Sequence, residues 1–249
     1  MSGTAGAGAT ASKWQGRHPL PAAQQGIWFA QQLDPHDPAF NTAEYHDISG
    51  SLCEAAFLAA ASQALSEADG LAVRVVAEAD GPMVEPWPEH RPRVEVVDLS
   101  EVADPPAAAH QLMRLDYERA IDPASDPMAR GILIRLAPDR HWWYQRINHL
   151  VIDGYGTILI NDRIVELYNA AVEGGQTGMP LDGYAAALEA DRAYLDSPRM
   201  ATDREFWLES DDDGASLPAL AAVVTSTGIP HRSDLAWDGP GARQLLELS

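Results

Sequence analysis

The sequence is poor in cysteine and contains no cluster of metal-binding residue types. Its single cysteine, Cys53, cannot form an intramolecular disulfide, and no CxxC or His/Cys group has the spacing of zinc ligands. This composition is typical of a cytoplasmic protein, and we expect no metal site and no bound cofactor. Cys53 lies in an alanine-rich segment, where we expect it to be buried as a small apolar residue.

The sequence is also poor in basic residues and in long apolar runs. Seventeen Lys and Arg stand against 37 Asp and Glu, which gives a net charge of -20. Such a chain has no broad cationic surface, so nucleic acid is not an expected partner. No apolar run is long enough to span a bilayer, and the N-terminus lacks the apolar stretch of a secretion signal. We therefore expect neither membrane insertion nor secretion.

The chain of 249 residues is 46% hydrophobic, enough for one substantial core or two small lobes. Residues 1–16 are rich in Gly, Ala, Ser and Thr and are predicted to form a disordered lead-in. Residues 17–175 carry most of the periodic segments and are predicted to form one lobe. Residues 176–249 are predicted to form a helical and irregular linker region.

Apolar periodicity predicts an α/β sandwich. Pro21 is a plausible first helical residue, and Pro138-Asp139 suggests a hairpin turn between two strongly apolar strands. The helices at 53–68, 107–120 and 157–172 are expected to cover a mixed or mainly antiparallel sheet. Strands are predicted at 40–48, 71–78, around Val84, and at 94–97, 131–137 and 141–152, and further helices at 184–195 and 202–208.

The segment Asn148-His-Leu-Val-Ile-Asp-Gly154 is the best candidate for chemistry, because it lies where an apolar strand ends and a helix begins. Rigid backbone can hold His149 at the edge of a cleft, Asp153 can fold back to fix the loop, and Gly154 permits backbone angles that other residues resist. The alternative is a histidine that is simply satisfied by neighbouring backbone at a turn.

The two polar residues at the strand end point to opposite faces, because side chains alternate along a strand. If Asn148 or His149 acts on a substrate, the other is structural. We expect Trp28, Trp142, Trp143 and Trp207 to pack in the core. The two faces are Trp142, Tyr144, Arg146 and Asn148 on one side and Trp143, Gln145, Ile147 and His149 on the other.

Five segments resemble the successive core motifs of the condensation domains of nonribosomal peptide synthetases. They are HPLPAAQQGIWFAQQLDP, LAVRV, MARGILIRL, WWYQRINHLVIDGYG and DREFW, in this order. The resemblance runs from about His18 to the end of the chain and is closest to siderophore synthetases such as enterobactin synthetase. In that family the signature is His-His-x-x-x-Asp-Gly, and its second His lies where two carrier-protein tunnels meet. This role falls on His149, with Asp153 and Gly154 as the matching residues.

The chain departs from the family pattern at two positions. Asn148 replaces the first His of the signature, and we expect this change to be tolerated because the position faces packing. The family's Arg that follows a Leu and pairs with the motif Asp is replaced by Ala72. Arg74, two positions on and on the same side of a strand, is the expected substitute partner of Asp153.

The resemblance implies a fold, a reaction and partners. The fold is the chloramphenicol acetyltransferase-like sandwich, of which this chain would be the first of two lobes. The reaction joins a carrier-bound acyl thioester to the amine of a carrier-bound aminoacyl thioester. Partners would be carrier protein domains, whose phosphopantetheine arms hold both substrates, and other synthetase modules. Alone, the 249 residues are expected to fold but not to catalyse, because the second lobe is missing.

Two other functions stay open. One is a CoA-dependent acyltransferase of the same fold, although in chloramphenicol acetyltransferase the signature lies near the C-terminus, whereas about a hundred residues follow Gly154 here. The other is a non-catalytic module that only docks a carrier protein, an option that Asn148 and Ala72 keep open. Within the family reading, His149 either removes a proton from the amine or holds the amine in place.

Overall fold

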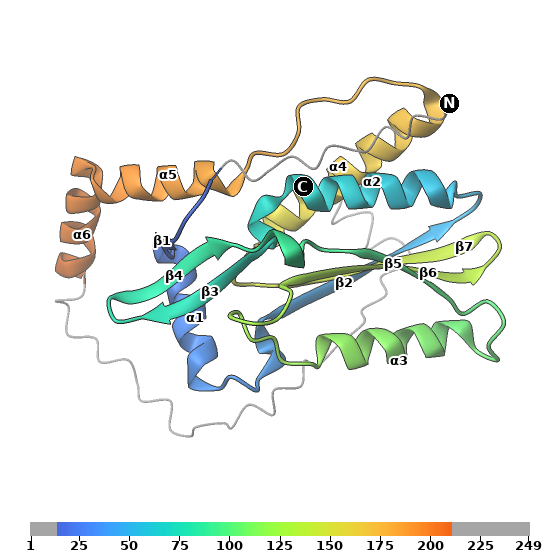
Figure 1. Cartoon of the computed structure of the whole chain (residues 1–249), viewed down its shortest axis with the longest axis horizontal. Helices are drawn as coiled ribbons and strands as arrows, with labels where there is room; N and C mark the ends of the chain where they lie inside the picture. Colours follow the sequence, from blue (N-terminus) through green and yellow to red (C-terminus); the bar gives the residue numbers. More distant parts are fainter. Residues whose placement is uncertain (1–13, 211–249) are drawn as a thin grey trace, which may run out of the picture.

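A computed structural model of the chain describes residues 14–210. These residues form two sheets and the helices around them (Figure 1). No helix in this stretch is long and apolar enough to cross a membrane. In chain order the elements are β1 His18–Pro19, α1 Ala22–Leu33, β2 Asn41–Ser49, α2 Glu54–Glu67, β3 Val73–Glu78, β4 Gly81–Pro86, β5 Val94–Asp98, α3 Pro105–Tyr117, β6 Ala129–Ala137, β7 Arg140–Asn148, α4 Gly154–Glu173, α5 Tyr184–Leu195 and α6 Pro198–Ser210, with short 3-10 turns at Pro38–Phe40, Asp69–Leu71 and Pro88–His90.

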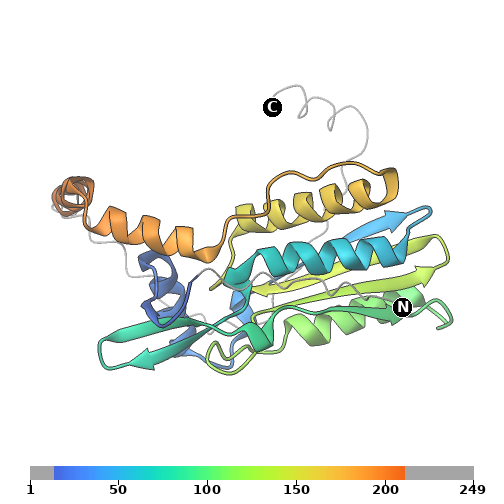
Figure 2. The same cartoon turned by 45° about the horizontal axis from the view of Figure 1, so that its top comes forward.

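The larger sheet has the strand order β2-β7-β6-β5. Strands β6 and β7 form the predicted hairpin, β2 runs antiparallel to β7, and β5 runs parallel to β6. Helices α2 and α4 cover one face of this sheet and α3 covers the other, as Figure 2 shows. The predicted mixed sheet with its three covering helices is therefore confirmed.

The side chains of β7 supply both faces of the core, as their alternation predicts. Trp143 and Ile147 pack with α2 and α4, whereas Trp142 and Tyr144 pack on the α3 side. All four are at most 3% exposed. Burial of a large apolar side chain contributes roughly 1.5–3 kcal/mol, so this one strand anchors both layers.

The smaller sheet, β1-β4-β3, is a separate antiparallel sheet that the sequence did not distinguish from the larger one. It packs against α1 and α5 through an apolar cluster that also contains Leu150, from the loop after β7. Trp14 belongs to this cluster and is 6% exposed. Trp14, which falls within the predicted lead-in of residues 1–16, is thus packed against the smaller sheet, while residues 1–13 lie outside the described residues.

Two predictions of burial are wrong. Cys53 is exposed because it is the residue before α2, where its backbone N–H donates to the Tyr168 hydroxyl at 3.1 Å. Trp207 is 70% exposed because α6 lies at the margin of the described structure, where its main contact is with α5.

An ion-pair cluster ties α2 to the sheet and makes stability depend on pH. Glu54 accepts hydrogen bonds from Arg135 Nε at 2.8 Å and Nη2 at 2.6 Å, and lies 2.9 Å from His141 Nε2. Bonds from Arg135 and then His141 lower the pKa of Glu54 to about 2. Because this pKa is lower in the folded state, the contribution to stability is present above the ordinary value of 4.5 and is lost as the pH falls toward about 2.

We therefore expect Glu54→Gln to lower the free energy of unfolding at pH 7 by roughly 1–3 kcal/mol, because the buried His141 loses its charged partner and Arg135 loses one of two, the other being Asp98. The difference from the wild-type chain should shrink as the pH falls toward 2. Thermal unfolding followed by circular dichroism at pH 7, 4.5 and 2.5 measures this. A difference that stays constant over this range would contradict the assignment of the charge effect to Glu54.

Candidate functional site

Asn148 ends β7 and has a structural role. It is 1% exposed, and its Oδ1 accepts a hydrogen bond from the Leu150 N–H at 2.9 Å. Its own N–H donates to the Met128 carbonyl at 2.8 Å. The side chain therefore turns the chain out of the strand from a packed position, as the alternation along β7 predicts.

His149 occupies the next position and is held by two backbone carbonyls. Its N–H donates to the Phe40 carbonyl at 2.7 Å, and its ring Nδ1 lies 2.6 Å from the Ile152 carbonyl oxygen. A carbonyl oxygen can only accept, so the ring proton belongs on Nδ1. In the neutral ring Nε2 then carries a lone pair. The half-buried ring thus presents a hydrogen-bond and proton acceptor from a fixed orientation.

Asp153 shapes the other end of the loop by capping α4. Its Oδ1 accepts from the Gly156 N–H at 2.7 Å, and its backbone carbonyl accepts from the Thr157 N–H and hydroxyl, both at 3.1 Å. An Asp at this position satisfies one of the free N–H groups of the first helical turn. The five-residue loop His149–Asp153 is therefore fixed at both ends by the chain's own hydrogen bonds.

The predicted pairing of Arg74 with Asp153 is wrong. Arg74 Nε donates to Glu85, and its guanidinium lies 5.4 Å from the centre of the Trp87 ring. The reason is register, because Arg74 and Glu85 are directly opposite each other on β3 and β4. Opposite charges at such positions attract. Asp153 is exposed and finds its partners in α4 instead.

Of the two glycines in the first turn of α4, Gly156 and not Gly154 is the one with a steric requirement. Gly154 is the first residue of α4, and its φ angle is not positive. A Cβ added there would have no atom within 4 Å. The expectation that Gly154 adopts backbone angles closed to other residues is therefore wrong. A Cβ on Gly156 would lie 2.9 Å from Ile152 Cγ1 and 3.3 Å from Asp153 Oδ1.

This difference gives a matched pair of variants. Gly156→Ala should displace the cap and lower the free energy of unfolding by roughly 1–3 kcal/mol, because the added methyl overlaps Ile152 and presses on Asp153. Gly154→Ala should change it by less than about 0.5 kcal/mol, since the position is helical and open. Urea unfolding of both variants measures the two values. Equal losses would mean that the loop does not have the described geometry.

Gln24 and Tyr184 hold the loop from outside, and the sequence reasoning missed both. Gln24 Nε2, on α1, donates to the Leu150 carbonyl at 2.6 Å, and its Oε1 accepts from the Tyr184 hydroxyl at 2.5 Å. Burial raises the pKa of Tyr184, which keeps this hydroxyl protonated as a donor. The available signal was weak, because Gln24 lies within the motif LPAAQQGIWF but nothing in its spacing points to a residue 126 positions away.

An apolar surface lies next to the loop. Within residues 14–210, no three His, Cys, Asp or Glu side chains converge as metal ligands. The first turns of α4, next to the loop, instead expose large apolar side chains. Tyr155 is 69% exposed and Ile158 is 56% exposed. A single half-buried histidine beside an apolar surface suits acid–base or positioning chemistry.

Residues 14–239 match the protein-family model described as Condensation domain. The dimodular nonribosomal peptide synthase of Bacillus subtilis strain 168 is 39% identical over 235 residues, which are 93% of this chain and 10% of that protein. The isonitrile lipopeptide synthase of Streptomyces coeruleorubidus is 36% identical over 222 residues, 87% of this chain and 15% of that protein. Enterobactin synthase component F of Escherichia coli K12 is 31% identical over 220 residues, 86% and 17% respectively.

Solved structures agree with these relatives. The starter condensation domain of rhizomide synthetase RzmA matches with a TM-score of 0.71 and 36% identity, over 78% of this chain and 50% of that one. VibH, a condensation enzyme of nonribosomal peptide synthesis, matches with a TM-score of 0.68 and 27% identity, over 76% and 44%. A variant of the RzmA domain has been solved with C8-CoA. This chain spans about half the length of the two solved domains.

Proposed function

Because this chain belongs to the condensation-domain family of nonribosomal peptide synthetases, we propose that it supplies the histidine of an amide-forming domain. The acyl group of one carrier-bound thioester would be transferred to the amine of an aminoacyl thioester on a second carrier. The fold fits this reaction class, since the α/β sandwich is the expected chloramphenicol acetyltransferase-like one. The division into a lobe at residues 17–175 and a linker region at 176–249 is part of the same proposal.

The free lone pair on His149 Nε2 is the observation that carries the proposal. The amine nitrogen attacks the thioester carbon, a C–N bond forms, and the C–S bond breaks. The proton lost by the attacking amine is accepted or hydrogen-bonded by Nε2 and ends on the departing thiolate. Proton transfer of this kind contributes roughly 10²–10⁴-fold. Orientation of two tethered substrates can contribute as much or more.

The other motif residues are proposed to position His149. Asn148 fixes the strand end, Asp153 fixes the start of α4, and Gln24 holds the Leu150 carbonyl between them. None of these side chains needs to touch the substrate. The exposed apolar side chains Tyr155 and Ile158 would then border the substrate path, where exclusion of water favours attack by the amine.

Partners and setting follow from the relatives. Carrier proteins with phosphopantetheine arms and other synthetase modules are the proposed partners, in the cytoplasm, with no cofactor held by this chain. The similarity to enterobactin synthase component F supports a siderophore product. A second candidate is an acyl-CoA donor in place of a donor carrier, which is favoured by the C8-CoA complex of the RzmA domain.

The test is reconstitution of the reaction with the whole condensation domain that contains this chain. Loaded donor and acceptor carriers are mixed with the domain, and the acceptor is followed by intact-protein mass spectrometry. We expect its mass to rise by the acyl group. A parallel reaction with C8-CoA in place of the donor carrier separates the two donors. Binding of the carriers without any amide formation would overturn the proposal in favour of a docking module. A further reaction with the 249-residue chain alone measures how much amide these residues form by themselves.

A further inference from the structure

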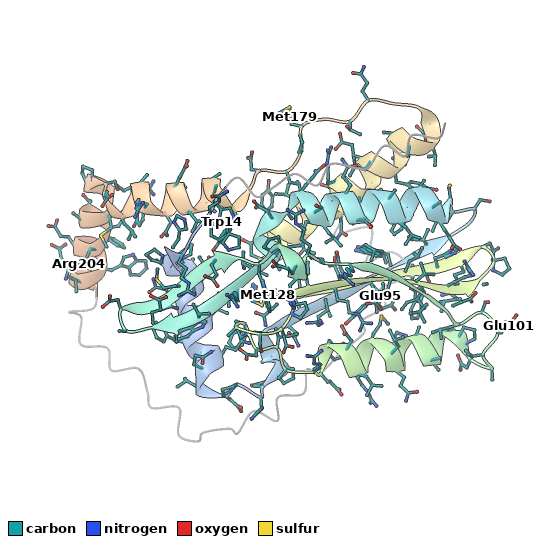
Figure 3. All side chains as sticks on the ribbon, viewed as in Figure 1. Trp14, Glu95, Glu101, Met128, Met179 and Arg204 are labelled. Atoms are coloured by element: carbon teal, nitrogen blue, oxygen red, sulfur yellow. The ribbon has the colours of Figure 1, made fainter. Side chains whose placement is uncertain are left out.

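We propose that a cleft between α3 and the β5–β6 edge of the larger sheet binds a phosphate group of a small molecule. The cleft has a volume of about 430 Å³, within the range of small-ligand sites. Its lining includes Glu95 of β5, which is labelled in Figure 3. Two of its lining residues, Arg130 and Arg146, contact Asp116 of α3. This inference does not depend on amide formation.

A buried arginine with an unused donor lies in the wall of the cleft. Arg146 is 3% exposed and is held by one hydrogen bond, from its Nε to Asp116 Oδ2 at 2.9 Å. Its Nη1 is buried and has no hydrogen-bond partner among the described residues. A buried charged donor without an acceptor is rare and costly. The guanidinium is therefore oriented by Asp116 while another of its nitrogens is free for a second acceptor.

The strand register concentrates positive charge at this point. Arg130 on β6 is directly opposite Arg146 on β7, and like charges at such positions repel. Asp116, at the end of α3, bridges them by accepting from Arg130 Nη1 at 2.9 Å as well as from Arg146. Arg130 also donates to Glu95 Oε2 at 2.7 Å. Carboxylates thus hold the two arginines next to each other, because Asp116 accepts from both and Glu95 accepts from Arg130.

Further arginines surround the opening. Arg91, Arg93 and Arg119 complete a lining of five arginines against three carboxylates, an excess of two positive charges. In a chain with a net charge of -20, such a local excess is unusual. Arg93 is exposed and forms no ion pair with any residue between 14 and 210. The arginines come from four separate segments of the chain, so the fold, and not a local basic run, brings them together.

The number of donors favours phosphate over carboxylate. A carboxylate presents two oxygens and one negative charge, whereas a phosphate monoester presents three oxygens and up to two negative charges. The excess of two positive charges in the lining matches the charge of a phosphate monoester better than that of a single carboxylate. The volume also leaves room for an organic group attached to the phosphate. The same chemistry could come from free phosphate, from phosphopantetheine or from coenzyme A.

Isothermal titration calorimetry on the 249-residue chain at low ionic strength tests the proposal. The probes are inorganic phosphate, phosphopantetheine, coenzyme A, and pantetheine as the counterpart that lacks phosphate. We expect binding of the phosphate-bearing probes, weakening as salt rises, and none of pantetheine. Arg93→Gln should raise the Kd roughly three- to tenfold, and Arg199→Gln, an equally conservative change on exposed α6, should leave it unchanged.

Arg146→Lys examines the buried donor while keeping its charge. It should weaken binding more than Arg93→Gln does, because the single nitrogen of a lysine cannot occupy the positions of both Nε, which binds Asp116, and Nη1. Thermal unfolding shows whether the Arg146→Lys variant is folded. If it is not, the Arg93→Gln variant, which changes an exposed residue, still tests the proposal. Equal affinity for malonate and phosphate would overturn the assignment to phosphate. No binding of any phosphate-bearing probe, or binding that Arg93→Gln does not change, would overturn the site itself.

Discussion

Replacement of His149 by Ala should lower amide formation by at least about tenfold, and by up to ~10⁴-fold if Nε2 acts as a general base. The physical reason is the loss of a proton acceptor whose orientation is fixed by the Ile152 carbonyl. The measurement is a single-turnover rate in the condensation domain that contains this chain, with loaded donor and acceptor carriers.

The matched control is Asn148→His, which restores the doubled histidine of the family signature. Because Asn148 is 1% exposed and faces packing, this variant should change the rate much less. The pH dependence of the rate distinguishes the two possible roles of His149. If His149 is a general base, the rate of the wild-type domain rises with pH over a range in which the rate of the Ala variant does not. Large and equal losses in both variants would contradict the assignment of the two residues to opposite faces.

Replacement of Asp116 by Ala should produce the largest loss of stability in the chain, about 3–5 kcal/mol. Asp116 accepts from Arg146 Nε, Arg130 Nη1 and the Tyr144 hydroxyl, each at 2.9 Å. Burial by itself would raise the pKa of Asp116, but the charge of Arg146 and the hydrogen bonds from Arg130 and Tyr144 bring it below its ordinary value. The carboxylate is therefore charged, and its removal leaves Arg146 buried without a counter-charge.

Urea unfolding of the 249-residue chain measures this loss, with Asp47→Ala as the control. Asp47 forms a shorter pair with Arg140, at 2.6 Å, but both side chains are more than a third exposed. Surface pairs of this kind contribute roughly 0–1 kcal/mol. If the two variants lost the same stability, burial would not determine the strength of these pairs and the account of the α3 face would be wrong.

The sequence predicted those features that depend on local periodicity. Alternation along β7 assigned Trp142 and Trp143 to opposite faces, and the structure confirms both. It also placed Asn148 in a packed position. These features follow from the two-residue period of a strand, which needs no knowledge of what lies across the sheet.

Features that depend on strand register or on distant contacts could not be predicted. Arg74 was assigned to Asp153, but the β3–β4 register puts Glu85 directly opposite it. The contact of Gln24 with the Leu150 carbonyl joins residues 126 positions apart, and no local pattern indicates it. Gly154 looked important because of its place in the motif, whereas the packing of Ile152 shows that Gly156 is the crowded position.

The tautomer of His149 is the most direct test of the account, because the proposed chemistry requires a free lone pair on Nε2. The ¹⁵N chemical shifts of the imidazole nitrogens report which nitrogen carries the proton. The ¹⁵N-labelled chain contains eight histidines, and a His149→Gln sample identifies the signals of His149. We expect a neutral ring with its proton on Nδ1, held by the Ile152 carbonyl, and a bare Nε2. A neutral ring with its proton on Nε2 would show that His149 cannot accept a proton from the amine at that atom, and would contradict the central claim.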